Sequence, residues 1–212
     1  EMADFVGIAF DLAFKYRNPA IILADGVIGQ MMEKVVLPEQ RTRLTDEEVI
    51  ARCPWATTGR TQHRKPNIIT SLELDPAEME KRNIHLQKKY AEIEENEVRF
   101  EELHCEDAEY LIVAFGSCAR IAQKAMEMAR AEGIKVGLLR PITLWPFPSK
   151  AIAARAAQVK GILTVELNAG QMVEDVRLAV ACKVPVEHFG RLGGIVPDPD
   201  EVITALKEKL IK

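Results

Sequence analysis

The pattern of apolar and polar positions divides the chain into three segments, of which the first predicts helix, strand and helix. Apolar residues at every third or fourth position predict a helix over residues 2–16, and Pro19 ends it because the residue before a proline avoids the helical conformation. The apolar run at residues 20–24 predicts a short buried strand, and a second helix through Val35 is expected to stop at Pro38. A parallel strand is normally covered by helices on both faces, so this one needs sheet neighbours from elsewhere.

The middle segment, residues 41–106, is polar and poor in strand signals. Asp75 as N-cap, Pro76 at the first helical position and Glu78 in a capping box predict the start of a helix of about 25 residues. A narrow apolar stripe along it consists of Met79, Leu86, Tyr90, Ile93 and Phe100. The stripe favours packing on the protein itself or on a tightly bound subunit. Half of a coiled coil is the alternative.

The last segment, residues 108–212, repeats strand then helix four times, which is typical of a doubly wound parallel sheet. Strands are predicted at residues 111–115, 136–139, 162–165 and 184–189, each followed by a helix. The fourth strand is the most polar and suits a sheet edge. The final helix begins with a capping box between Asp198 and Glu201. We therefore predict an α/β domain here.

Composition excludes several classes of protein. The chain has 48% hydrophobic residues, 28% charged residues and a net charge of −4, without a basic cluster, so a nucleic-acid partner is not predicted. The longest apolar runs, such as residues 111–115, are much shorter than the roughly 20 residues of a membrane helix. The start of the chain lacks the basic and apolar regions of a signal peptide. We expect a cytoplasmic protein without membrane contact, and because Glu1 opens directly on a predicted helix, a fragment or processed chain.

The cysteines and histidines carry no metal-binding pattern. The four cysteines are far apart, so neither zinc, an iron–sulfur cluster nor a dithiol redox site is predicted, and we expect reduced thiols. These residues are Cys53, Cys105, Cys118 and Cys182. The four histidines, His63, His85, His104 and His188, are equally isolated. No glycine pattern matches a dinucleotide fingerprint or a phosphate loop, which disfavours a free-standing nucleotide-binding protein.

Two loops follow predicted strands at the edge where open α/β sheets bind ligands. Cys118 lies at a helix start, which can activate a thiol, but no base is nearby and a structural role is favoured. Glu166 is the best-placed carboxylate and forms a polar turn with Asn168, Gly170 and Gln171. We expect Asn168 to cap the next helix, and Glu166 to hold the turn or contact a neighbouring subunit.

Four stretches, residues 10–19, 25–33, 133–148 and 166–177, resemble the α subunits of 2-oxoacid:ferredoxin oxidoreductases, most closely the branched-chain members that act on 2-oxoisovalerate. Residues 10–19 and 25–33 resemble the end of that family's pyrimidine-binding domain, and residues 133–148 and 166–177 resemble its transketolase C-terminal-like domain. The motifs include Asp25-Gly26-Val27-Ile28-Gly29-Gln30, Arg140-Pro141-Ile142-Thr143-Leu144-Trp145-Pro146-Phe147-Pro148 and Glu166-Leu167-Asn168-Ala169-Gly170-Gln171. The resemblance implies a pyrimidine-binding-like end at residues 1–40, a linker at 41–107 and a transketolase C-terminal-like domain at 108–212.

The resemblance also implies an activity. Family members decarboxylate a 2-oxoacid oxidatively with coenzyme A and reduce ferredoxin, using thiamine diphosphate, magnesium and iron–sulfur clusters. It implies β and iron–sulfur subunits as partners in an oligomer. The family's thiamine-activating glutamate and its Tyr-Pro-Ile-Thr-Pro-like motif would precede Glu1, so no catalytic, cofactor-binding or metal-binding residue is assigned in this chain. Asp25 and Gly26 are the residues expected nearest to the cofactor or a partner subunit.

Two other functions stay open at this stage. One is a non-catalytic assembly or regulatory module that reuses the same fold, since a fold does not fix a function. The other is the same reaction with 2-oxoglutarate as substrate, because the family members specific for 2-oxoglutarate share much of this sequence pattern.

Overall fold

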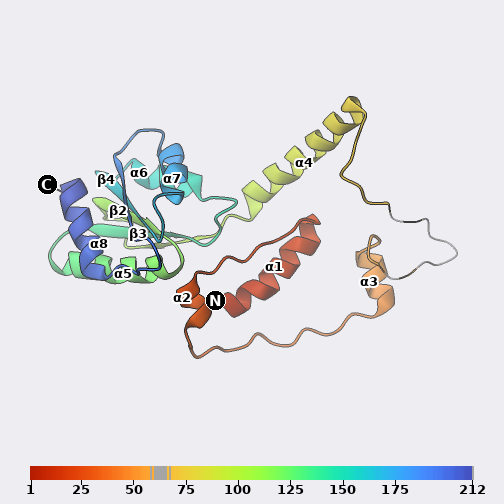
Figure 1. The fold of residues 1–212 in the computed structure, drawn as a ribbon, viewed down its shortest axis with the longest axis horizontal. Coiled ribbons are helices and arrows are strands. Elements are labelled where there is room, and N and C mark those ends of the chain that lie inside the picture. The colour runs from red at the N-terminus through yellow and green to blue at the C-terminus, as the bar shows by residue number, and fades with distance from the viewer. Residues whose placement is uncertain (58, 60–65, 67, 212) are drawn as a thin grey trace. The chain divides into compact units, whose positions relative to one another are not determined.

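The chain divides into two compact units in the computed structural model, which describes residues 1–57, 59, 66 and 68–211 (Figure 1). The helical unit comprises Glu1–Ile22 and Glu33–Lys89, and the sheet unit comprises Leu23–Met32 and Tyr90–Lys212. His63 lies outside the described residues. Among the described helices, none combines the length and apolar character needed to cross a bilayer.

The helical unit contains α1 (Met2–Tyr16), α3 (Asp46–Arg52) and the first part of α4 (Pro76–Asn96). The predicted helix at residues 2–16 is confirmed. The long helix is also confirmed, with 21 residues, and Asp75 caps it by accepting hydrogen bonds from the Ala77 and Glu78 N–H groups.

The predicted strand at residues 20–24 is wrong for the described structure, because these residues pair with no strand. A strand is stable only where a neighbour satisfies its backbone groups, and Ile21 and Leu23 are instead 80% and 70% exposed. The helix after it, α2 (Gly26–Gln30), ends before Val35. The apolar residues at 20–24 are therefore not part of a hydrophobic core in the described structure.

A five-stranded sheet in the order β1-β3-β2-β4-β5 forms the centre of the sheet unit. Its strands are β1 (Phe100–Leu103), β2 (Tyr110–Ala114), β3 (Val136–Pro141), β4 (Gly161–Glu166) and β5 (Val186–Gly190). The four predicted strands are present and parallel, with the most polar one at an edge. The sheet is mixed, however, because β1 runs antiparallel to β3 at the other edge. This strand falls in the segment predicted to be poor in strands.

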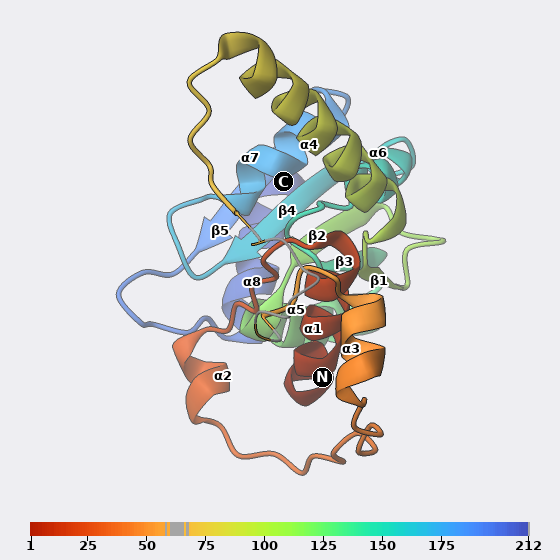
Figure 2. The same ribbon diagram turned by 90° about the vertical axis from the view of Figure 1, so that its right-hand side faces the viewer.

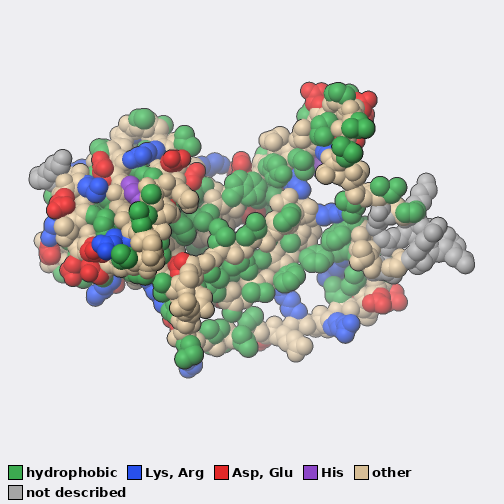
Figure 3. Space-filling view, in the orientation of Figure 1, with side chains coloured by type: hydrophobic (Ala, Val, Ile, Leu, Met, Phe, Trp, Pro, Cys, Tyr) green, Lys and Arg blue, Asp and Glu red, His purple; other side chains and the backbone are tan. Residues whose placement is uncertain are grey.

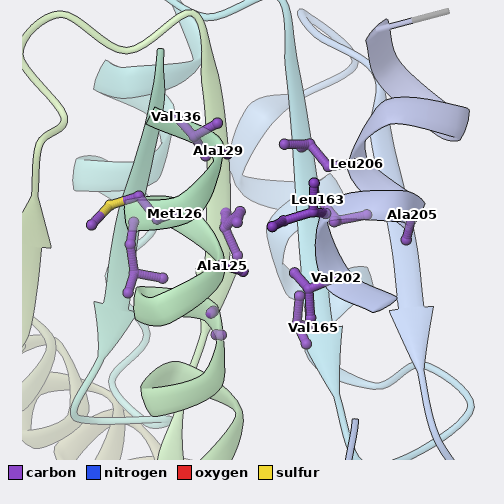
Figure 4. Packing of buried hydrophobic residues seen from close by; sticks show 14 of the residues in the cluster. Ala125, Met126, Ala129, Val136, Leu163, Val165, Val202, Ala205 and Leu206 are labelled. Atoms are coloured by element: carbon purple, nitrogen blue, oxygen red, sulfur yellow. The ribbon is translucent and has the colours of Figure 1, made fainter. Parts of the chain in front are cut away.

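Helices cover both faces of this sheet (Figures 1 and 2). The helices are α5 (Gly116–Ala131), α6 (Ser149–Ala156), α7 (Met172–Val180) and α8 (Pro199–Leu206), and a π-helical turn at Lys207–Ile211 follows. The helices α5 and α8 pack on one face, where Leu163 and Val165 meet Ala125, Val202 and Leu206 (Figure 4). The helices α6 and α7 pack on the other face. Burying each Val or Leu side chain of these cores contributes about 1.5–3 kcal/mol, which holds the helices against the strands.

The helical unit, in contrast, exposes much of its apolar surface (Figure 3). In α1, Val6, Phe10 and Phe14 lie four residues apart along one side of the helix, and Phe10 is 63% exposed. Contiguous exposed apolar side chains of this size are typical of a surface that another protein segment covers.

Candidate functional site

The site to be considered lies at the carboxyl ends of β2 and β4. These strands are neighbours, with Ala114 opposite Val165, and the chain moves outward from them in opposite directions, to β3 on one side and to β5 on the other. Such a switch point is where open α/β sheets usually bind ligands. Gly116 and Ser117 follow β2 here, and Glu166 ends β4.

The Glu166 carboxylate is buried, with 1% of the residue exposed, and it caps α7. One oxygen, Oε2, accepts hydrogen bonds from the N–H groups of Gln171 at 3.3 Å and Met172 at 2.9 Å. The other, Oε1, accepts from the Val173 N–H at 3.0 Å. The helix dipole adds to these bonds, because a negative charge is stabilised at a helix N-terminus. The prediction that Glu166 holds the turn is thus confirmed.

The expected cap by Asn168 is wrong. Its side-chain oxygen accepts instead from the Gly170 N–H at 2.7 Å, which closes a tight turn before the helix. Gly170 has a φ of +114°, a conformation that side-chain-bearing residues rarely adopt. Asn168 therefore shapes the loop, and Glu166 satisfies the helix.

His188 on β5 is a part-buried member of this cluster, although its sequence context predicts no partner for it. Its Nε2 lies 3.2 Å from the Asn168 carbonyl oxygen, which can only accept, so Nε2 carries a proton. Its Nδ1 lies 3.2 Å from the Thr164 hydroxyl and 3.4 Å from Glu166 Oε1. Thr164 and His188 are register partners on β4 and β5, which brings them together.

Asp25 occupies the other helix end at the switch point. Its Oδ1 accepts from the Ile28 N–H at 2.9 Å and caps α2, while its Oδ2 accepts from the Ser117 N–H at the start of α5, at 3.3 Å. Burial opposes ionisation of this carboxyl, but the hydrogen bonds from Ile28 and Ser117 outweigh it, so the pKa of Asp25 is lowered. The carboxylate is therefore the stable form at neutral pH.

Cys118 is buried in the first turn of α5 and is not activated. Burial raises its pKa to about 12, and the negative charges of Asp25 and Glu166 act in the same direction. Burial likewise raises the pKa of Cys105 to about 11. The structural role predicted for Cys118 agrees with this, because a thiol must ionise to act as a nucleophile.

We expect the thiols to differ sharply in alkylation by iodoacetamide at pH 8. Cys182 is exposed and should react first, whereas Cys105 and Cys118 should react only after unfolding, since roughly 0.1% or less of either thiol is ionised at that pH. Peptide mapping by mass spectrometry measures the rates, and a Cys182→Ser variant should lose the fast reaction. Native Cys118 alkylated as fast as Cys182 would contradict this description.

A third loop at the same edge, residues 142–148 after β3, is held by hydrogen bonds and presents an aromatic side chain. The N–H groups of Ile142 and Thr143 donate to the Arg99 carbonyl, and the Thr143 hydroxyl donates to the Pro146 carbonyl at 2.7 Å. Trp145 is 53% exposed and contacts Tyr90 edge to face, with ring centroids 5.7 Å apart. The loop is thus held in one conformation with an exposed tryptophan.

Comparisons with known proteins identify this architecture. The family model of pyruvate:ferredoxin oxidoreductase core domain II matches residues 108–202. The ketoisovalerate oxidoreductase subunit VorB of Methanothermobacter marburgensis is 46% identical over 98% of this chain and 57% of its own length. The chain is a homologue of the VorB subunit. It spans a little over half the length of that relative.

More distant relatives of this chain have other substrates in their names. The 2-oxoglutarate synthase subunit KorA of Archaeoglobus fulgidus is 31% identical over 90% of the chain and 53% of its own length. Among solved structures, the 2-oxoglutarate:ferredoxin oxidoreductase of Magnetococcus marinus, with 2-oxoglutarate, coenzyme A and succinyl-CoA bound, matches with a TM-score of 0.56 at 26% identity. That match covers 64% of this chain and 24% of the other.

At the switch point, the described residues of this chain do not fit thiamine diphosphate or a metal ion. The two carboxylates at the switch point, Asp25 and Glu166, are engaged by backbone N–H groups, and both helix N-termini that would attract a diphosphate are filled by them. No three His, Cys, Asp or Glu side chains are grouped as metal ligands in the described part of the chain. The arrangement is therefore one that holds loops in place.

Proposed function

We propose that this chain forms part of the α subunit of a 2-oxoacid:ferredoxin oxidoreductase whose substrates are branched-chain 2-oxoacids. The observation that carries the proposal is the difference between relatives: identity is 46% to a ketoisovalerate oxidoreductase subunit and 31% or less to 2-oxoglutarate synthase subunits, over nearly the whole chain in each case.

The reaction is the CoA-dependent oxidative decarboxylation of a 2-oxoacid. The carboxylate leaves as carbon dioxide, the acyl group passes to the thiol of coenzyme A, and the released electrons reduce ferredoxin. Thiamine diphosphate supplies the carbanion chemistry of this reaction when bound. Because the described residues do not fit that cofactor, we assign its binding, and that of magnesium and the iron–sulfur clusters, to other parts of the complex.

Within the complex, residues 108–212 act as a transketolase C-terminal-like domain that supports the active site from outside. The hydrogen-bonded loop with Trp145 and the turn held by Glu166 lie at one edge of its sheet and offer a rigid surface to a neighbouring subunit. We assign residues 1–40 to the end of a pyrimidine-binding-like domain and residues 41–107 to a linker. The exposed apolar side of α1 supports this assignment, because such a surface requires a covering segment.

A non-catalytic assembly module is the second candidate, and one observation favours it. Both carboxylates at the switch point, Asp25 and Glu166, are engaged in capping, so neither is free to act as an acid or base. The two candidates differ in one property: only the first turns over 2-oxoacids.

The proposal is tested by producing the complete gene product that contains this chain together with its partner subunits. We expect ferredoxin reduction that requires both a branched-chain 2-oxoacid and coenzyme A. Omitting coenzyme A from the same preparation is the matched control. If the assembled, cofactor-loaded complex fails to reduce ferredoxin with every 2-oxoacid tested, the enzymatic function is rejected and the assembly module is favoured.

A further inference from the structure

Three polar side chains lie together on the face of the sheet that packs on α7. On β4, Leu163 and Val165 belong to the core on the other face, which meets α8 (Figure 4). Thr164 and Glu166 alternate with them along the strand and therefore lie on the α7 face. His188 is opposite Thr164 on β5 and shares that face. Because Thr164 has no exposed surface and Glu166 only 1%, these polar groups must satisfy one another.

The hydroxyl of Thr164 has two acceptors within reach. Its oxygen lies 3.2 Å from His188 Nδ1 and 3.3 Å from the Glu187 carbonyl oxygen. A hydroxyl has one proton, so it donates to only one of them at a time. His188 Nδ1 in turn has two neighbours, the hydroxyl and, at 3.4 Å, Glu166 Oε1. The cluster therefore allows two hydrogen-bond patterns.

The charge of the imidazole decides between these patterns. In a neutral ring with its proton on Nε2, Nδ1 is an acceptor, so the Thr164 hydroxyl donates to it and the Glu166 carboxylate faces a lone pair. With a second proton, Nδ1 donates to Glu166 Oε1, and the hydroxyl donates to the Glu187 carbonyl instead. Both patterns use the same positions of the heavy atoms, so taking up the proton requires no movement of the backbone.

We propose that His188 is a proton-dependent latch on the turn at residues 167–171, between β4 and α7. In both patterns Nε2 donates to the Asn168 carbonyl oxygen, 3.2 Å away. After proton uptake the same ring also binds Glu166, the residue that caps α7, through a charge-assisted hydrogen bond. The ring then ties both the turn and the helix cap to β5. The turn opens less often at acid pH for this reason.

Glu166 is the charged side chain that lies against the imidazole in the described part of the chain. Glu187 precedes His188 on the strand, so its side chain points to the opposite face of the sheet. The other charged residues on α7 and next to β5 are exposed or paired elsewhere: Glu174, Asp175 and Arg177 on α7, and Arg191, which pairs with Glu201.

The direction of the pH dependence follows from the charge of the ring. The stabilising pair exists only while His188 carries two protons. The extra protection of the turn is therefore present at acid pH and is lost as the pH rises through the titration of His188. This latch acts within the chain and does not depend on the oxidoreductase function, so the readout is hydrogen exchange and not catalytic activity.

The test compares wild type with His188→Gln at about pH 5.5 and about pH 8. The glutamine amide can donate to the Asn168 carbonyl but cannot gain a charge. Protection factors, corrected for the intrinsic exchange rate at each pH, are measured for the Gly170 and Val173 amides, which donate to Asn168 and Glu166. In wild type we expect protection at least about threefold higher at the lower pH. In His188→Gln the two protection factors should be equal.

His85→Gln is the matched control, because His85 is exposed on α4 and its loss should leave the wild-type ratio unchanged. Thr164→Val is a second variant, which removes the hydroxyl and keeps the charged pair, so its ratio should be at least that of wild type. Equal protection at the two pH values in wild type would overturn the proposal. So would a wild-type ratio in His188→Gln, or equal protection in Thr164→Val.

Discussion

Replacing Glu166 with alanine is expected to destabilise the sheet unit by about 3 kcal/mol, because it leaves buried backbone N–H groups without an acceptor. The carboxylate accepts from three backbone N–H groups, and two of them belong to the buried residues Met172 and Val173. Both of these N–H groups are buried, so losing their acceptor carries the desolvation cost of an unpaired donor. The free energy of unfolding, measured by urea denaturation followed by circular dichroism, gives the result.

Glu174→Ala is the matched control for this change. Glu174 is also an acidic residue in the first turn of α7, but it is exposed. Its loss removes only a charge–dipole interaction worth about 0.3–1 kcal/mol. Equal destabilisation by the two variants would show that Glu166 acts through its charge alone and that the capping hydrogen bonds contribute nothing.

Replacing Gly190 with alanine is expected to cost about 2–3 kcal/mol, or about 4–12 °C in Tm for a chain of this size. A Cβ at this position would lie 2.1 Å from the Asn168 carbonyl oxygen and 2.7 Å from His188 Nε2. The first of these atoms is backbone in a loop closed by the Asn168 turn, so it cannot give way without loss of that turn. Thermal unfolding measures the change.

Gly29→Ala provides the control for the effect of adding a methyl group. A Cβ at Gly29 has no atom within 4 Å and the residue lies in α2, so the change should stay within about 0.5 kcal/mol of wild type. If Gly190→Ala unfolds at the wild-type temperature, the close approach of β5 to the turn after β4 does not exist in solution.

Local patterns in the sequence predict most of the sheet unit. The apolar runs give β2, β3 and β4, which are buried on both faces, and the Asp198–Glu201 capping box forms as expected at α8. The strand β1 was missed because it is an edge strand with two glutamates and no apolar run. Its charges are satisfied by neighbours: Glu101 pairs with Arg140, and Glu102 with Arg155.

The candidate site shows what a local pattern cannot predict. Glu166 could be chosen from its place at a strand end, but its capping role depends on the path of the next five residues. His188 looked isolated because its partners, Thr164 and Asn168, lie on another strand and its following loop. Asp25 and Ser117 are 92 residues apart, and only the packing of α2 on α5 brings them together. The exposed run at residues 20–24 fails for a related reason, since a strand needs a partner.

The most direct test of the account compares two substrates in one enzyme preparation. The assembled complex containing this chain is assayed for CoA-dependent ferredoxin reduction with 2-oxoisovalerate and with 2-oxoglutarate, and kcat/KM is determined for each. We expect at least about tenfold higher kcat/KM for 2-oxoisovalerate, a difference that a pocket shaped for an apolar side chain readily provides. A higher kcat/KM for 2-oxoglutarate would contradict it.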